Sequence, residues 1–246
     1  MNSLELFKTQ KFYQIDISIL KDLGYDVLLS NRIFDSLLFW KYDILFSYFY
    51  RYSFFAALLA KCFGKKTYFT GGIDSLDSDY ASAFNYKIQA LFFKLCYWVA
   101  DSCIIVSQSD LKNIFKVSSL KKKLSYSEHV INTKLFIADV PKEKIFTSIV
   151  WMGDEGNVVR KGVDKALQIF AELKKIPEFV DYRFVIIGRK GEGEVLVRSI
   201  IDKYNLKGSV ELKGEVSEED KINLLKQSKY YFQLSLYEGF GLAALE

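Results

Sequence analysis

The chain has 246 residues, of which 50% are hydrophobic and 26% are charged. This composition is typical of a folded globular protein and excludes a long disordered or low-complexity tract. The formal net charge of +4 is too small to indicate nucleic-acid binding. Three cysteines lie in apolar runs without metal-ligand spacing. They predict free buried thiols, as in a reducing cytosol.

The charge is unevenly distributed along the chain. Residues 1–147 carry a net charge of +5, whereas residues 148–246 carry −1. A basic first half suits an anionic partner. Residues 1–30 alternate charged and apolar positions, unlike a secretory signal peptide, so we expect a cytoplasmic protein. The most apolar stretch, residues 90–106, is interrupted by two charges and is too short to span a bilayer.

In residues 1–138, short apolar runs alternate with longer amphipathic ones, which predicts βα units around a parallel sheet. The first predicted helix, residues 12–23, ends at Gly24, a residue type that readily stops a helix. Strands are expected at residues 25–30, 42–48, 66–70, 102–106 and 123–128, and further helices at 53–63, at 80–100 and from a cap at Ser109 or Asp110.

A polar stretch with Pro141 interrupts this pattern, and we assign residues 139–147 to an interdomain linker. A second βα series follows in residues 148–246. Ser217 with Asp220 three residues on resembles a capping box and predicts a helix start. The strands of this series are expected at residues 148–152, 182–187, 210–213 and 229–236, and its helices at 162–175, 194–204, 217–227 and from Gly241.

Two such series predict an α/β fold of two Rossmann-like domains that face each other across a cleft. Open α/β sheets bind ligands at the carboxyl ends of their strands, so we expect the functional residues there. The first series begins with a helix where such domains normally begin with a strand. The second stops two turns into its fourth helix, and both domains are therefore expected to be incomplete.

The segment 238–246 directly follows the last predicted strand. Its two glycines let the backbone approach a ligand closely. The helix that begins near Gly241 points free amides and its positive dipole end at an anion such as a phosphate. Glu238 lies in the turn and Glu246 roughly 10 Å further along the helix. The two carboxylates can thus contact opposite ends of an extended ligand, although glutamates at this spacing are also common on ordinary helix surfaces.

Three other turns follow predicted strands in this half. Arg160-Lys161-Gly162 places two cations beside a helix start, where Arg can bind a diphosphate bidentately and Lys acts as a point charge. A solvated basic turn is the alternative. Residues 188–193 form a glycine-rich loop that does not fit G-x-G-x-x-G, so they do not support a dinucleotide enzyme. Gly214-Glu215-Val216 is unremarkable by itself.

Taken together, these turns resemble the family 4 retaining glycosyltransferases of the GT-B fold. Their order and spacing over residues 149–246 carry the resemblance, including Ser-Leu-Tyr-Glu-Gly-Phe-Gly-Leu at 235–242 followed by Glu246. The first half matches more loosely, at residues 20–27, 104–107 and 130–136.

The resemblance implies roles for individual residues. Arg160 and Lys161 are expected to hold the donor diphosphate and Glu238 to contact the transferred sugar, and these three are the candidate catalytic residues. The family needs no metal, because cations and the helix dipole stabilise the departing diphosphate; we expect no cofactor. Further donor contacts are expected from Gly188, Gly214, Glu215, Val216, Phe240, Gly241, Leu242 and Glu246.

The chain departs from the family pattern in the first half and after residue 153. Gly153 is followed by Asp154 where many relatives carry an arginine, so Arg160 alone can supply that charge. Gly72 and Asp74 lie where many relatives carry a histidine near the sugar, and are the candidate sugar or acceptor contacts. The glycine-rich loop after the family's first strand is absent.

Three further features have ordinary structural explanations. Asp77-Ser78-Asp79 matches the metal-binding D-x-D of the GT-A fold, but helix capping explains it, and we expect no metal. His129 is the single histidine and is expected to be structural. Lys121-Lys122-Lys123, with Lys112 and Lys116, forms either a solvated face or a contact with anionic lipid headgroups.

The sequence therefore predicts a glycosyltransferase that moves a sugar, with retention, from a UDP- or GDP-sugar to a sugar or lipid-linked acceptor. Such an enzyme would act in surface polysaccharide or glycolipid synthesis, in the cytoplasm or at the inner face of the membrane. Two alternatives stay open: an inactive GT-B-like fragment that binds a nucleotide or a partner, and a GT-B UDP-sugar epimerase. The sugar, the base and the acceptor are not specified.

Overall fold

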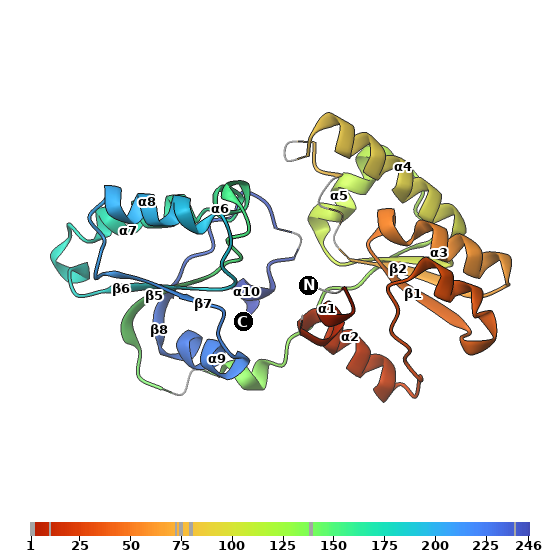
Figure 1. Cartoon of the computed structure of the whole chain (residues 1–246), viewed down its shortest axis with the longest axis horizontal. Helices are drawn as coiled ribbons and strands as arrows, with labels where there is room; N and C mark the ends of the chain where they lie inside the picture. Colours follow the sequence, from red (N-terminus) through yellow and green to blue (C-terminus); the bar gives the residue numbers. More distant parts are fainter. Residues whose placement is uncertain are drawn as a thin grey trace. The chain divides into compact units, whose positions relative to one another are not determined.

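The computed structural model describes residues 3–9, 11–71, 73, 76–78, 81–137, 140–238 and 240–246. The chain divides into two compact units, Met1–Val130 and Ile131–Glu246. Each unit is built on a four-stranded parallel sheet flanked by helices, which confirms the predicted α/β class (Figure 1). The division falls at residue 130, before the predicted boundary at 138, because residues 133–136 form a short 3₁₀ helix that packs on the second unit.

In the first unit the strand order is β1-β2-β3-β4, so neighbours in sequence are neighbours in space. Right-handed crossovers between such strands place all connecting helices on one side of the sheet. The strands are β1 Ile44–Tyr48, β2 Lys66–Thr70, β3 Ser102–Ile105 and β4 Leu124–Tyr126. The helices are α1 Ser3–Thr9, α2 Lys11–Asp22, α3 Tyr50–Cys62, α4 Ala83–Val99 and α5 Gln108–Val117, with 3₁₀ turns η1 Ile33–Leu37 and η2 Phe39–Lys41.

Three predictions for this unit are wrong. Residues 25–30 are not a strand: they are mostly exposed and pair with no strand of the described chain. Ser107 caps α5 in place of Ser109 or Asp110, and its hydroxyl accepts from the Asp110 amide at 3.1 Å. Ser82 caps α4 by accepting from the Asn85 amide at 3.3 Å, so Asp77-Ser78-Asp79 does not cap this helix. Asp79 lies outside the described residues.

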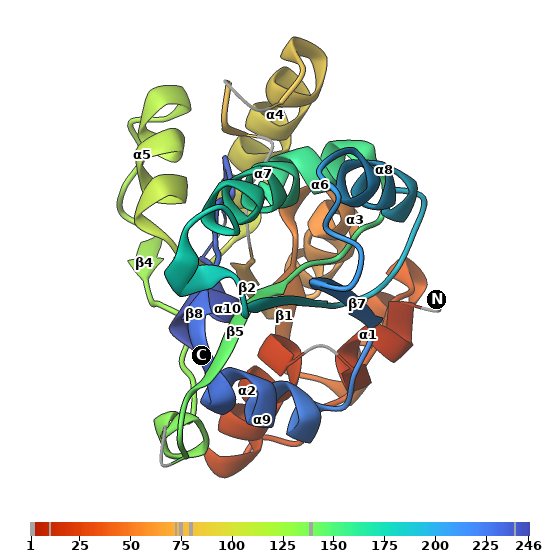
Figure 2. The ribbon, with the colours of Figure 1, turned by 90° about the vertical axis from the view of Figure 1, so that its left-hand side faces the viewer.

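The second unit has the strand order β7-β6-β5-β8. Helices α6, α7 and α8 cover one side of this sheet and α9 covers the other (Figures 1 and 2). The strands are β5 Glu143–Ile149, β6 Arg183–Ile187, β7 Val210–Gly214 and β8 Ser228–Tyr231. The helices are α6 Glu155–Arg160, α7 Val163–Leu173, α8 Glu194–Lys203, α9 Glu218–Gln227 and α10 Leu242–Leu245, with 3₁₀ turns η4 Thr133–Phe136 and η5 Pro177–Phe179.

The strand after the predicted linker begins earlier than expected. β5 starts at Glu143, inside residues 139–147, because its charged first residues are exposed while Ile145 to Ser148 are buried. Helix α6 is not among the predicted elements; Asp154 caps it by accepting from the Asn157 amide at 2.7 Å. The predicted cap of α9 is confirmed, since the Ser217 hydroxyl accepts from the Asp220 amide at 3.0 Å.

The last strand ends earlier than predicted. β8 stops at Tyr231 instead of residue 236, after the Phe232 amide donates to the Thr147 carbonyl at 2.8 Å. Stacked rings hold the β5–β8 pair together: Phe146 lies 4.8 Å from Tyr230 and 4.9 Å from Phe232 between ring centroids. Residues 232–238 are therefore an extended segment whose start is anchored in the core and whose end can carry a site.

Candidate functional site

All strands of the second sheet are parallel, but the order in which the chain adds them reverses at β5. From β5 the chain crosses to β6 and β7 through helices on one side, and it returns to β8 through α9 on the other side. The loops after two such strands diverge, and this divergence creates the crevice in which open α/β sheets bind ligands. The candidate site residues of the basic turn and of segment 232–238 follow these two strands.

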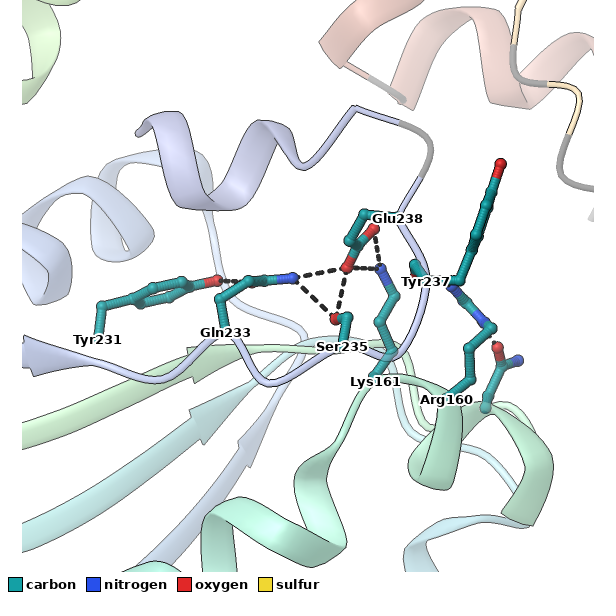
Figure 3. A network of polar contacts seen from close by, with 8 residues as sticks. Arg160, Lys161, Tyr231, Gln233, Ser235, Tyr237 and Glu238 are labelled. Atoms are coloured by element: carbon teal, nitrogen blue, oxygen red, sulfur yellow. Dashed lines mark hydrogen bonds and ion pairs between the residues drawn. The ribbon is translucent and has the colours of Figure 1, made fainter. Parts of the chain in front are cut away.

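Lys161 and Glu238 are brought together at this switch point (Figure 3). The Lys161 ammonium lies 2.6 Å from Glu238 Oε1 and 2.8 Å from Oε2. The side chains are 21% and 24% exposed, so water screens this pair less than it screens surface ion pairs. An ammonium has three donors and Glu238 takes two. In the described chain the third N–H has no acceptor and is available to a ligand.

A polar network fixes the Glu238 carboxylate. Its Oε1 also accepts from Gln233 Nε2 and from Ser235 Oγ, each at 2.6 Å. The Tyr231 hydroxyl donates to Gln233 Oε1 at 2.9 Å and thereby orients the amide (Figure 3). Among the described residues, Oε1 thus accepts three hydrogen bonds and Oε2 accepts one, so Oε2 keeps lone-pair capacity for a ligand hydroxyl.

Tyr231 and Gln233 belong to the site although the sequence motifs do not single them out. The predicted single buried strand over residues 229–236 does not distinguish the side chains on its two faces. Side chains of an extended chain alternate between two sides. Tyr231, Gln233 and Ser235 therefore share one side, while Phe232 and Leu234 pack on the core. This two-residue alternation is the sequence signal that could have found them.

Arg160 contacts a different part of the same segment. Its guanidinium donates to Asn157 Oδ1 at 3.0 Å and to the Tyr237 carbonyl at 3.3 Å. Its own carbonyl accepts from the Leu236 amide at 2.8 Å. Arg160 thus ties residues 236–237 to helix α6, next to Lys161. Its expected contact with the donor diphosphate stays a prediction.

Gly162 is required by the packing of this turn. It caps α7 with φ +67°, and a Cβ added there would lie 2.0 Å from the Leu234 carbonyl oxygen. No side chain fits this approach, and the left-handed conformation itself favours glycine. The glycine of the basic turn therefore lets Lys161 lie against the segment that carries Glu238.

Gly188, directly after β6, lies against the backbone that follows β5 and is hydrogen-bonded to the end of β7. Gly188 has φ +128°, and a Cβ there would lie 2.0 Å from the Val150 carbonyl oxygen. Its amide donates to the Gly214 carbonyl at 2.8 Å. Glu215 is exposed, and Val216 packs beside a small core cluster. Close packing of the backbone thus explains Gly188, and the nucleotide contacts expected of these loops stay predictions.

Glu246 pairs with helix α9 and not with the network around Glu238. Its Oε2 lies 2.5 Å from Lys221 Nζ, and both side chains are largely buried. Burial raises the pKa of Tyr231, and the negative charges of Glu238 and Glu246 raise it further. The roles expected of Phe240, Gly241, Leu242 and Glu246 toward a donor stay predictions.

A separate titratable cluster lies at the carboxyl end of β1. The Tyr48 hydroxyl donates to Asp16 Oδ2 at 2.7 Å. Burial raises the pKa of Asp16, whereas the Tyr48 hydrogen bond and His129 lower it. Burial lowers the pKa of His129, and the Asp16 charge opposes that shift. His129 also lies 5.8 Å from the Phe12 ring between centroids, so it packs within this unit.

The expected sugar or acceptor contacts, Gly72 and Asp74, lie outside the described residues. In the described part of the chain, no group of three or more His, Cys, Asp or Glu side chains is arranged to hold a metal ion. None of the described helices combines the length and the apolar character that crossing a membrane requires.

Comparisons with known proteins bear on the second unit most directly. Residues 156–246 match the family model described as glycosyl transferases group 1. The GDP-mannose:cellobiosyl-diphosphopolyprenol alpha-mannosyltransferase of Xanthomonas oryzae is 34% identical over 90 residues, which are 36% of this chain and 23% of that protein. One component of human phosphatidylinositol N-acetylglucosaminyltransferase is 33% identical over 89 residues, 36% of this chain and 18% of that protein. The match thus spans less than a quarter of either relative.

Solved structures extend the likeness to both units. The crystal structure of Anabaena Alr3699/HepE in complex with UDP and glucose matches 85% of this chain and 57% of that chain. Its TM-score is 0.66 at 13% sequence identity, which shows a shared fold. The predicted resemblance is confirmed by the family match together with this fold. Residues 156–246 are thus similar to the group 1 glycosyltransferases, and the chain as a whole shares the fold of solved GT-B structures.

Proposed function

We propose that this protein transfers a sugar, with retention, from a nucleotide-diphosphate donor that binds at the β5/β8 switch point. One observation carries the proposal: a lysine and a glutamate from the two diverging loops meet there at 2.6 Å, and each keeps hydrogen-bonding capacity. The lysine can donate hydrogen bonds to the phosphate oxygens of a sugar diphosphate. The oriented carboxylate beside it can accept hydrogen bonds from the hydroxyls of the sugar.

The Lys161 ammonium is the proposed diphosphate contact. Its remaining N–H can donate to a phosphate oxygen while Glu238 holds the ammonium in place. Negative charge grows on the leaving diphosphate as the bond to the sugar breaks. A fixed cation at that position stabilises this charge without having to reorganise. Arg160, tied to Asn157 and Tyr237, is the second cation of this turn.

The Glu238 carboxylate is the proposed sugar contact. Gln233 and Ser235 fix it through Oε1, and Oε2 can accept from a sugar hydroxyl. A carboxylate held by this many donors is a poor nucleophile, which favours direct transfer over a covalent intermediate. In direct transfer, the acceptor oxygen bonds to C1 on the face that the phosphate leaves. This attack on the same face keeps the anomeric configuration, and the leaving phosphate oxygen takes the acceptor proton.

The proposed acceptor is a sugar or a lipid-linked sugar, in synthesis of a surface polysaccharide or glycolipid. Both relatives described above carry a lipid in their names, a diphosphopolyprenol in one and phosphatidylinositol in the other. The nucleotide stays open between two choices. The bacterial relative is named for GDP-mannose, whereas the HepE structure holds UDP. We also propose that the protein acts in the cytoplasm without a metal cofactor.

A thermal-shift panel of UDP, GDP and their common sugar derivatives tests the proposal. One nucleotide series should stabilise the wild type and Lys165→Ala, whose exposed lysine lies on α7 one turn from the site. The same ligands should not stabilise Lys161→Ala. Equal stabilisation of Lys161→Ala, or no response to any nucleotide, would overturn the proposed site. NMR of the transferred sugar then tests retention, and binding without transfer would favour an inactive nucleotide-binding protein.

A further inference from the structure

Helix α4 presents an apolar stripe to solvent. Phe84, Leu91 and Trp98 are 72%, 55% and 71% exposed. They are seven residues apart, so they lie on one side of the helix. Lys87 and Lys94, also exposed, fall between them with the same spacing. Large aromatic side chains are normally buried, and a row of them in water indicates an interaction surface.

Helix α3 adds to the same layer. It packs directly against α4: the Phe54 and Phe92 rings lie 6.0 Å apart, and the Cys96 thiol lies 3.1 Å from the Tyr50 carbonyl. Both helices connect consecutive strands and so cover one side of the first sheet (Figure 1). The exposed aromatic residues of α3 are Tyr52 and Phe55. Together with the α4 stripe, they form what we call the α3–α4 face.

The charge of this layer is strongly one-sided. Helices α3, α4 and α5 contain six Lys or Arg residues and a single acidic residue, Asp110, which is buried. The helices α7, α8 and α9 of the second unit contain five basic and seven acidic residues. Four of the six basic residues belong to α3 and α4, and one of these, Lys61, pairs with Asp101 at 2.9 Å. The helices of this layer are thus more positive than the helices of the second unit.

The lysine cluster predicted from the sequence adjoins the end of α4. The Lys123 ammonium donates to the carbonyls of Tyr97 and Trp98 at 3.1 and 3.0 Å. Lys121 lies 4.7 Å from the Phe115 ring centroid. Lys123 thus caps the helix that ends beside Trp98. The positive charge of the cluster continues the α3–α4 face at that end.

We propose that the α3–α4 face docks on an anionic lipid bilayer. Trp and Phe prefer the headgroup level of a membrane, and interleaved lysines attract anionic headgroups. With 17 residues and two lysines on its outer side, α4 would lie along the surface. A second copy is disfavoured as the occupant, because a twofold contact would oppose like charges. The inference deepens the proposed function by naming a membrane surface, yet it uses no residue of the donor site.

Co-sedimentation with vesicles tests this inference. The wild type should bind vesicles of phosphatidylcholine mixed with phosphatidylglycerol, and bind vesicles of phosphatidylcholine alone far less. Lys87→Glu with Lys94→Glu should weaken binding at least about 25-fold, from about fivefold for each lysine near the surface. Phe84→Ser with Trp98→Ser should weaken it at unchanged charge. Circular dichroism of each variant should match that of the wild type, because the substituted side chains are exposed.

The matched control is Lys165→Glu with Lys203→Glu, which makes the same charge change on exposed positions of α7 and α8. This variant should bind as the wild type does. An equal loss of vesicle binding in both lysine variants would show that net charge alone attracts the protein, and would overturn the assignment of the α3–α4 face. Vesicle binding that does not depend on phosphatidylglycerol would overturn it too. The same holds if the wild type self-associates and Phe84→Ser with Trp98→Ser abolishes this self-association. Nucleotide binding is measured separately, so failure here leaves the donor site untouched.

Discussion

The Lys161 ammonium and the Glu238 carboxylate lie 2.6 Å apart although 77 residues separate them in the chain. They follow β5 and β8, two strands that pair in parallel while their connections leave on opposite sides of the sheet. Both side chains are mostly buried, so water cannot fully solvate either charge if the ion pair breaks. The pair is therefore a fixed dipole at the switch point of this sheet, the place where open α/β sheets generally bind ligands.

Replacing Lys161 should weaken nucleotide binding. Lys161→Met keeps most of the apolar stem but removes the charge, so a bound diphosphate loses one charge-assisted hydrogen bond. Such bonds contribute about 1.5–3 kcal/mol, which corresponds to a loss in affinity of about 10- to 100-fold. Isothermal titration with UDP and GDP measures this, with Lys165→Met as the control. Unchanged affinity would contradict a phosphate contact by Lys161.

Replacing Glu238 should separate sugar transfer from nucleotide binding. Glu238→Gln keeps the side-chain shape but no longer competes with phosphate for the Lys161 ammonium. We expect the free nucleotide to bind at least as tightly as it does to the wild type. The transfer rate should fall about 100-fold or more, because the contact with the sugar is lost where charge develops. Glu219→Gln, on the exposed side of α9, is the control, and equal turnover in both variants would exclude the proposed role.

Two glycines with similar backbone angles should respond differently to substitution by alanine. Gly208 has φ +84° and open space where a Cβ would lie, whereas at Gly162 an added Cβ meets the Leu234 carbonyl oxygen. Gly208→Ala should lower the free energy of unfolding by about 1–2 kcal/mol, the cost of the left-handed conformation. Gly162→Ala should lower it by more than about 3 kcal/mol. Urea denaturation measures the free energy of unfolding of both variants. Equal decreases would mean that the backbone of Gly162 does not lie tightly against the Leu234 carbonyl.

Titration of His129 should make stability depend on pH. Burial lowers the pKa of His129 below its ordinary 6.5, so the unfolded chain takes up the proton first as the pH falls. The free energy of unfolding should therefore decrease from about pH 7 downward, by up to about 1.4 kcal/mol per pH unit, until the folded pKa is reached. Asp16 has the opposite sign: its pKa is raised, so its protonation favours the folded state at lower pH.

The single histidine makes this measurement direct. One imidazole proton resonance should titrate with a pKa below 6.5 in the folded protein. In His129→Gln the fall in stability between about pH 7 and about pH 6 should disappear. Asp16→Asn removes the opposing charge and should lower the pKa of His129 further. A histidine pKa above 6.5 would show that the Asp16 charge outweighs burial.

Local sequence patterns determined most of the elements but not all of their limits. The alternation of apolar runs predicted most of the strands, because a strand or helix must bury its apolar side whatever its partners are. Residues 25–30 have a strand-like composition but find no strand to pair with in the described chain. The predicted linker contains the start of β5 because Glu143 and Lys144 look like loop residues, although they are the exposed end of a strand.

The sequence by itself also determined the chemistry that the site can use. The basic turn, the glycines and the two glutamates are fixed by residue type and spacing. Only the tertiary structure decided which of them meet: Lys161 with Glu238, and Glu246 with Lys221. Phe84, Leu91 and Trp98 look like core positions in the sequence, and only the fold leaves them in water. Periodicity records how a side chain lies relative to its own helix or strand, whereas neighbours across a sheet depend on strand order and crossover direction, which no local pattern contains.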